Sequence, residues 1–310
     1  MFGKALTRGL LGAAVLASAA AAQGDTITHG STTINMDFVT VGNPGNAADT
    51  TVMNGGTSGY GSVGYTYRIG AYDVTAAQWA AVIAADPNVG TAGYWSGSQP
   101  VAGVSWNEAA MFCNWLTTGN ADSGYYTIVG GSATPNALSH DAYAALYGTT
   151  YFLPTENEWY KAAYYNPGTG TYYQYPTGSN SVPTAVYSGT AAGTAVFYDL
   201  NTGVDPSAPA DVDNAGGLSP YGTMGQGGNV WQWNEALIDE RPGEYRGLRG
   251  GSYDSLNGSY VLVSSYRYGA EPMYGYYDVG FRVASTPEPG SITLLVAGAI
   301  AGLICWRRWR

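Results

Sequence analysis

The sequence has few of the residues that metal and redox sites need. It contains two cysteines and two histidines among 310 residues. Cys305 lies near the C-terminus, so Cys113 stands alone in the body of the chain and no internal disulfide is expected. Cys113 falls in an apolar helical pattern, which predicts a buried, inert thiol. His29 and His140 are isolated in sequence, so they predict neither a zinc site nor a histidine-based catalytic triad.

Basic charge is also scarce. The chain has 12 Lys and Arg residues against 22 Asp and Glu residues, a formal net charge of −10. Five of the 12 basic residues lie in the two ends of the chain, at positions 4, 8, 307, 308 and 310. A strongly acidic domain argues against nucleic acid and anionic membranes as partners, and it suits cations such as calcium.

The N-terminus predicts export. Residues 1–22 begin with basic side chains, continue through an apolar run from Leu10 to Ala17 and end in small residues. This pattern is typical of a secretory signal peptide, which signal peptidase would cut after Ala22.

The C-terminus carries a second targeting segment over residues 286–310. Pro287, Glu288 and Pro289 precede an apolar run and a basic end. The run is short for a bilayer, which needs about 20 residues. The flanking tryptophans and basic stop nevertheless favour a transmembrane span at about 291–306 over a buried helix.

This tail resembles the PEP-CTERM sorting signal of Gram-negative, biofilm-forming bacteria. The resemblance implies that the chain is anchored transiently in the inner membrane. It also implies cleavage by an exosortase-type protease and release to the cell surface or the extracellular matrix.

Three capping boxes predict three short helices. In each, the side-chain oxygen of a Ser or Thr accepts a hydrogen bond from the backbone amide three residues later. The side chain of that later residue accepts one from the backbone amide of the Ser or Thr. The pairs are Thr75 with Gln78, Ser105 with Glu108 and Thr155 with Glu158. We therefore interpret Glu108, Glu156 and Glu158 as helix-start residues, with a catalytic carboxylate pair as the alternative.

The rest of the chain predicts short strands and long loops. Alternating patterns indicate strands near residues 34–39, 63–72, 229–234, 245–253, 260–268 and 278–284. Trp231 and Trp233 are two residues apart, which places both indoles on one side of an extended segment. Residues 119–150 and 166–226 are loop-dominated, and loops of this length are usually functional. The expected fold class is α+β with about three short helices.

Six motifs in order resemble the formylglycine-generating-enzyme, or sulfatase-modifying factor, domain. They are Ile69–Thr75, Pro100–Trp106, Phe152–Trp159, Gly228–Trp233, Arg249–Ser252 and Gly280–Arg282. The resemblance covers residues 37–285, with residues 23–36 as an N-terminal segment. It implies an irregular α+β fold related to C-type lectins.

The chemistry that the resemblance implies departs from this sequence. Enzymes of the family use two cysteines after the Gly-Gly-Ser strand to bind copper and activate oxygen, because the thiolate binds soft Cu(I). Here Ser255 stands near the first thiol position, and Asp254, Arg249 and Arg267 are the other expected cleft residues. The histidine set of the related iron-dependent sulfoxide synthases is also missing. We therefore expect no copper and a non-catalytic member.

The resemblance also implies calcium near the Gly-Asn-Val-Trp strand. Calcium prefers six to eight oxygen ligands. Asn229 and the carbonyl of Val230 match the family pattern, whereas Gln232 replaces a glutamate and removes one charge. Asp199 and the carbonyl of Leu200 are candidates for a second site. The alternative is that these groups form a turn and strand hydrogen-bond network.

The sequence supports three functional hypotheses. The first is an exported binding or matrix module, because its 27 tyrosines and 45 glycines suit a recognition surface for polysaccharide or a surface protein. The second is a residual or altered oxidase activity. The third is a purely structural biofilm component.

Overall fold

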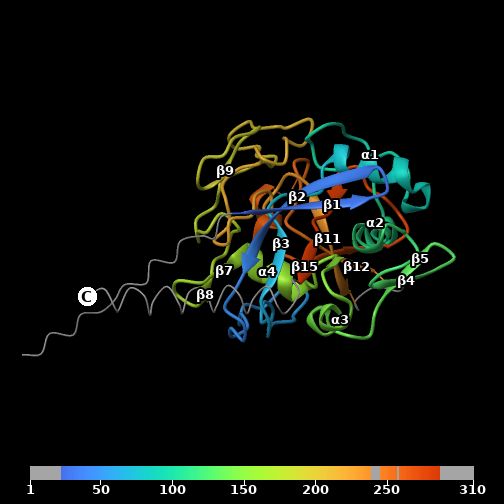
Figure 1. Ribbon diagram of the computed structural model, residues 1–310. Helices are drawn as coiled ribbons and strands as arrows, with labels where there is room; N and C mark the ends of the chain where they lie inside the picture. Colours follow the sequence, from blue (N-terminus) through green and yellow to red (C-terminus); the bar gives the residue numbers. More distant parts are fainter. Residues whose placement is uncertain (1–21, 239–244, 257, 287–310) are drawn as a thin grey trace, which may run out of the picture.

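The computed structural model describes residues 22–238, 245–256 and 258–286 (Figure 1). The helices are α1 Ala76–Ala85, α2 Trp106–Thr118, α3 His140–Tyr147 and α4 Glu156–Tyr164, with 3-10 turns η1 Pro87–Val89 and η2 Gly258–Leu262. The described ranges contain no helix that could cross a membrane. The predicted span, residues 287–289 and nearly all of the signal peptide lie outside them; Ala22 is exposed just before the first strand.

The larger sheet joins the beginning and the end of the described chain. Its order is β1-β2-β3-β15-β6, and every neighbouring pair is antiparallel. Its strands are β1 Gln23–His29, β2 Thr32–Val41, β3 Tyr67–Gly70, β15 Ala284–Thr286 and β6 Thr150–Phe152. Residues 23–36 form β1 and the start of β2, so this N-terminal segment belongs to the sheet.

The smaller sheet has the order β13-β12-β11-β14. Its strands are β11 Trp231–Leu237, β12 Arg246–Arg249, β13 Tyr268–Ala270 and β14 Val279–Gly280. Strand β13 lies at one edge, while β11 pairs with β12 on one side and with β14 on the other. Three two-stranded ribbons complete the described strands: β4 Tyr126–Val129 with β5 Ser132–Pro135, β7 Tyr165–Asn166 with β8 Thr171–Tyr172, and β9 Thr184–Ala185 with β10 Thr194–Ala195.

All three predicted capping boxes form, at the starts of α1, α2 and α4. The described residues contain one further α-helix, α3, in keeping with the predicted α+β fold of about three short helices. Ser139 precedes α3 but makes no capping bond; its hydroxyl donates to the Asp141 carboxylate instead. The start of α3 therefore lacks the residue pair that marks the other three.

The strand predictions hold best where the pattern is strongest. Trp231 and Trp233 are both buried in β11, and Tyr67 and Ile69 are buried in β3. The strand expected over 260–268 is wrong: that segment starts in η2, and β13 begins only at Tyr268. Val261 and Leu262 are buried in this 3-10 turn. A short apolar run can be buried in a helical turn as well as in a strand, so the sequence pattern alone did not distinguish the two.

Two local features remain: the glycine before β11, and Cys113, whose predicted burial is confirmed. Gly228 precedes β11 with φ +80°, and a side chain there would collide with the carbonyl of Val196, which explains the glycine. Cys113 is fully buried in α2, and burial raises the pKa of its thiol well above the usual value. Short strands, short helices and long loops make this the expected α+β fold.

Candidate functional site

Strand β11 connects two places where reactive side chains gather. Near its end, Glu235 reaches a buried histidine. At its start, Trp231 lines an open hollow. We call the first place the charge centre, formed by His140, Glu158 and Glu235, and the second the aromatic hollow.

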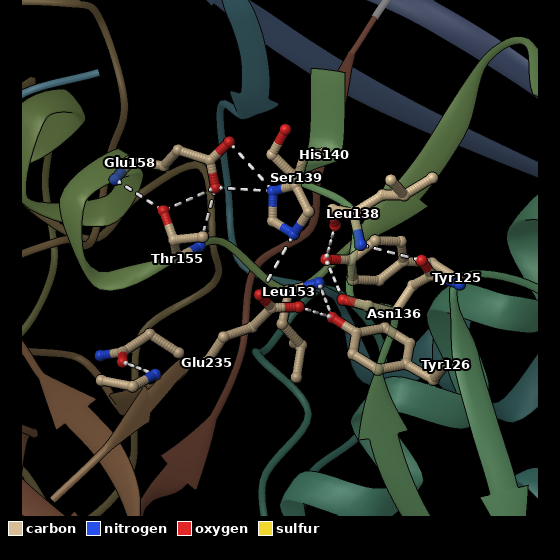
Figure 2. Close-up of polar contacts among 12 residues, drawn as sticks. Tyr125, Tyr126, Asn136, Leu138, Ser139, His140, Leu153, Thr155, Glu158 and Glu235 are labelled. Atoms are coloured by element: carbon tan, nitrogen blue, oxygen red, sulfur yellow. Dashed lines mark hydrogen bonds and ion pairs between the residues drawn. The ribbon is translucent and has the colours of Figure 1, made fainter. Parts of the chain in front are cut away.

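The charge centre sets one imidazole between two carboxylates (Figure 2). His140 Nδ1 lies 2.9 Å from Glu158 Oε2, and its Nε2 lies 3.2 Å from Glu235 Oε2. Tyr65 donates to Glu158 Oε1 at 2.9 Å, and Tyr126 donates to Glu235 Oε1 at 2.5 Å. The five groups come from five separate parts of the chain, so the centre ties them together.

The electrostatics of the centre favour a protonated imidazole. Burial alone would lower the pKa of His140, but the charges of Glu158 and Glu235 outweigh burial and raise it to about 10. Burial likewise pushes the pKa of Glu158 up, but the His140 charge and hydrogen bonds hold it below the usual value. The imidazole also stacks on Phe152, with ring centroids 3.5 Å apart.

The charge centre is closed to ligands. His140 is 1% exposed and Glu158 is 0% exposed. The helix-start interpretation of Glu158 is confirmed, because its Oε2 accepts from the Thr155 amide. His140 is isolated in sequence but not in space, since the fold brings it to two glutamates. No spacing in the sequence indicated the contact between His140 and Glu235, because the two residues are 95 positions apart. Glu235 comes from strand β11 of the smaller sheet, whereas His140 begins helix α3.

The aromatic hollow is open and has a volume of about 310 Å³. Among the described residues, its wall is aromatic and apolar and includes one carboxylate. The polar and aromatic members are Trp231, Tyr245, Tyr268, Tyr276 and Asp278. Volumes near this size are common for small-ligand sites, which are typically apolar with a few placed polar groups.

Two more hollows lie near the aromatic hollow. One, of about 180 Å³, lies at the edge strand β13, shares Tyr268 and Gly269 with it and includes Arg267. The other, of about 290 Å³, includes Arg246 and Glu271. Glu271 follows Ala270 of the aromatic hollow and accepts a hydrogen bond from Tyr245 at 3.1 Å.

The four expected cleft residues fall into two groups. Arg249 and Arg267 share the carboxylate of Glu156, at 2.6 Å and 2.8 Å, and their charges hold its pKa below the usual value despite burial. Ser255 and Asp254 belong to the other group, described next. Glu156 is therefore an ion-pair partner as well as the first residue of α4.

The second group lies beside the aromatic hollow. The Ser255 hydroxyl is 3.0 Å from that of Ser252, which donates to Asp278 at 2.8 Å. Asp254 accepts a hydrogen bond from the Tyr277 hydroxyl. These donors are hydroxyls and carboxylates, and the cysteine among the described residues, Cys113, is buried in α2. Such a set does not fit Cu(I), which prefers thiolates.

The predicted calcium residues are engaged in hydrogen bonds. Both ends of the Asn229 amide bind the backbone of Ala210, at 2.8 Å and 3.2 Å. Gln232 Oε1 accepts from Trp159 at 2.6 Å and from Arg282 at 2.7 Å. Val230 is buried beside them.

The second predicted pair lies in a different segment. Asp199 accepts from the Asn201 amide and the Thr202 hydroxyl within its own turn, and Leu200 is exposed. Among the described residues, no group of three or more His, Cys, Asp or Glu side chains is placed to hold a metal ion. The hydrogen-bond network that the sequence left open as an alternative is present; calcium binding stays a prediction.

Comparison with known proteins places this site in context. The model of the sulfatase-modifying factor enzyme 1-like domain family matches residues 46–287. The chain is 30% identical over 178 residues to hercynine oxygenase from Mycolicibacterium thermoresistibile and 33% identical over 130 residues to that from Mycobacterium tuberculosis. These matches cover 49% and 36% of the chain but only 36% and 27% of those enzymes.

Solved structures show the same fold at lower identity. Treponema denticola variable protein 1 superposes with a TM-score of 0.57 at 23% identity, over 85% of this chain and 99% of that one. PvdO from Pseudomonas aeruginosa gives 0.55 at 17% identity, over 81% and 94%. At these identities the likeness concerns the fold alone.

Proposed function

This chain belongs to the family of sulfatase-modifying factor enzyme 1-like domains, and we propose that it is a saccharide-binding member rather than an oxidase. The observation that carries the proposal is the aromatic hollow. Trp231, Tyr268 and Tyr276 present ring surface there beside one carboxylate. Aromatic rings offer large contact area at low entropic cost, and a carboxylate accepts hydrogen bonds from ligand hydroxyls.

The chemistry of the neighbouring residues supports binding over oxidation. The position nearest the family's first thiol holds Ser255, whose hydroxyl is hydrogen-bonded to Ser252. A hydroxyl at neutral pH is a poor ligand for Cu(I) and carries no redox chemistry of its own. What this site retains is a shaped, partly aromatic surface.

Saccharide binding is tested by calorimetry with purified full-length protein and a panel of bacterial surface polysaccharides. We expect saturable binding that falls at least about fivefold in Tyr268→Ala, since a ring contact contributes about 1 kcal/mol or more. Tyr187→Ala is the matched control, because Tyr187 is exposed but lines none of the three hollows. A panel without any binder would refute the proposal.

A second candidate function is oxidation, favoured by the similarity to proteins named hercynine oxygenase. The chain spans about a third of those enzymes' length or less. The test supplies copper, oxygen, a reductant and a Cys-x-Pro-x-Arg peptide, and measures aldehyde. We expect no aldehyde. Turnover that requires Ser255 or Asp254 would replace the binding proposal.

We propose further that the protein works outside the cytoplasm. The N-terminal pattern ending at Ala22 supports cleavage by signal peptidase, and Pro287–Pro289 support sorting by an exosortase-type protease to the cell surface or matrix. A purely structural role in a biofilm is the alternative. Mass spectrometry of the secreted protein tests the route, which predicts new termini after residue 22 and near residue 287.

Calcium remains part of the proposal as a stabilising ion near Asn229. The chain's formal charge of −10 supports a cation partner. Melting with calcium and with chelator tests it: a site that adds about 1 kcal/mol raises Tm by about 2–4 °C in a domain of this size. The rise should vanish in Asn229→Ala, and equal melting temperatures in calcium and chelator would remove calcium from the proposal.

A further inference from the structure

Most buried carboxylates in the described residues have a cation beside them. Asp73 lies 3.2 Å from Arg282, Glu156 lies 2.6 Å from Arg249, and Glu158 lies 2.9 Å from His140. Pairing of this kind offsets the cost of removing a charge from water. Each of these three buried carboxylates therefore has a counter-ion.

Asp278 departs from this pattern. It is half-buried on the wall of the aromatic hollow, and its carboxylate accepts one hydrogen bond from Ser252 at 2.8 Å. In the described part of the chain no Arg, Lys or His lies within ion-pair distance of it. Burial, and then the nearby charge of Asp254, raise the pKa of Asp278 above its usual value. A bound cation would offset both effects.

The rest of the wall suits a cation as well. Trp231, Tyr268 and Tyr276 surround the same hollow, and aromatic faces attract ammonium groups. Among the described residues, Arg267 and Arg246 line the two neighbouring hollows, and no cationic side chain lines this one. The guanidinium of Arg246 lies 3.9 Å from the centroid of the Trp106 ring, and Arg267 forms an ion pair with Glu156.

Resting on the proposed saccharide function, we infer that the ligand is an amino-sugar chain whose protonated amine binds Asp278. The sugar ring then lies against the aromatic wall. The neighbouring hollow supplies a second carboxylate, Glu271, for a following unit. A polymer of glucosamine that is only partly N-acetylated has this chemistry, with an apolar ring face and repeated ammonium groups. The acidic balance of the whole chain favours the approach of such a polycation.

Calorimetry with the full-length protein compares four probes: the tetramers of glucosamine, of N-acetylglucosamine and of a uronic acid, and spermidine as an amine without a sugar ring. We expect the glucosamine tetramer to bind at least tenfold more tightly than each of the others. Its affinity should also fall as salt is raised, because the contact is ionic. The glucosamine monomer should bind more weakly than the tetramer, because one unit cannot reach Asp278 and Glu271 together.

Two variants assign the contact. Asp278→Asn should abolish the preference for glucosamine over N-acetylglucosamine, and Glu271→Gln should weaken the tetramer but not the monomer. Asp122→Asn removes the same charge from an exposed residue outside the three hollows and should change neither affinity. A melting curve accompanies each variant. If Asp278→Asn does not fold, the affinity of Glu271→Gln and the salt dependence of binding still test whether the ligand amine contacts a carboxylate.

The outcomes separate this inference from the proposed function. Equal binding of the glucosamine and N-acetylglucosamine tetramers overturns the amine contact but leaves saccharide binding intact. Equal binding of spermidine overturns the commitment to a sugar, and preference for the uronic acid reverses the charge assignment. Failure of every saccharide in this panel and in the polysaccharide panel overturns both.

Discussion

The charge centre and the aromatic hollow are built on the same strand, yet they treat carboxylates in opposite ways. In the centre, Glu158 and Glu235 face a shared imidazole, and tyrosine hydroxyls donate to both. In the hollow, the Asp278 carboxylate accepts a hydrogen bond from the Ser252 hydroxyl and lines the open space. Complete pairing in a closed interior serves stability, whereas incomplete pairing beside an opening leaves interaction energy for a ligand.

The difference also separates two roles of β11. Its Glu235 end links the smaller sheet to α3 and α4, because His140 and Glu158 come from those helices. Its Trp231 end borders the hollow. Variants at the two ends should therefore differ in kind: those at the centre change the free energy of unfolding, and those at the hollow change affinity.

The largest effect is expected for Glu158→Gln. Its two oxygens accept from four groups: the Thr155 amide and hydroxyl, Tyr65 and His140. An amide has one oxygen, so buried donors lose partners and the ion pair is lost. We expect a loss of about 3–5 kcal/mol in the free energy of unfolding. Chemical denaturation measures it.

Glu108→Gln is the matched control for that variant. Glu108 accepts from the Ser105 amide at 2.8 Å in the same capping geometry, but it takes part in no ion pair among the described residues. The glutamine oxygen can still accept from that amide, as Gln78 Oε1 accepts from the Thr75 amide at 2.8 Å in α1, so we expect a loss of about 0.5 kcal/mol or less. Similar losses in the two variants would show that the charge centre adds nothing beyond helix capping.

An intermediate effect is expected from pH. The folded pKa of His140 is raised to about 10 from an unfolded value of about 6.5. Its stabilisation is therefore complete below pH 6.5 and declines as pH rises toward 10. Between pH 7 and 8 the free energy of unfolding should fall by about 1 kcal/mol. Asp73, whose pKa burial raises to about 7 against the opposing charge of Arg282, is half protonated at pH 7 and adds a smaller decline of the same sign up to about pH 8.

Above pH 8 a second group opposes this decline. Burial lowers the pKa of Lys161 to about 8, so raising the pH from 8 toward 10.5 deprotonates the folded lysine first and favours folding. The stability curve should therefore flatten above pH 8. Denaturation at half-unit steps from pH 7 to 9.5 measures it. A flat curve from 7 to 8 would contradict a protonated His140, and the slope should be shallower in Glu158→Gln.

Local patterns in the sequence predicted some of these parts and not others. The capping boxes were predictable because Thr155 and Glu158 interact across three residues, and the paired burial of Trp231 and Trp233 follows from strand alternation. The α+β class followed from such local rules together with the family resemblance.

The charge centre was not predictable, because it depends on how separate segments pack. His140 meets Glu235 across 95 positions, and neither neighbourhood contains a metal-like or catalytic spacing. The same holds for the wall of the hollow, where Asp278 and Trp231 meet through the parallel pairing of β11 with β14. Tertiary placement, rather than residue type, turned a single histidine into an ion-pair centre.

The smallest effect on stability is expected at the hollow, for Tyr276→Ala. The ring is exposed on a loop, and such substitutions usually change the free energy of unfolding by about 0.5 kcal/mol or less. Affinity for the saccharide should nevertheless fall about tenfold, because the ring is part of the wall that the ligand covers. Calorimetry and denaturation on the same preparation measure both quantities. A stability loss of several kcal/mol with unchanged affinity would mean that the two ends of β11 do not divide stability and binding between them.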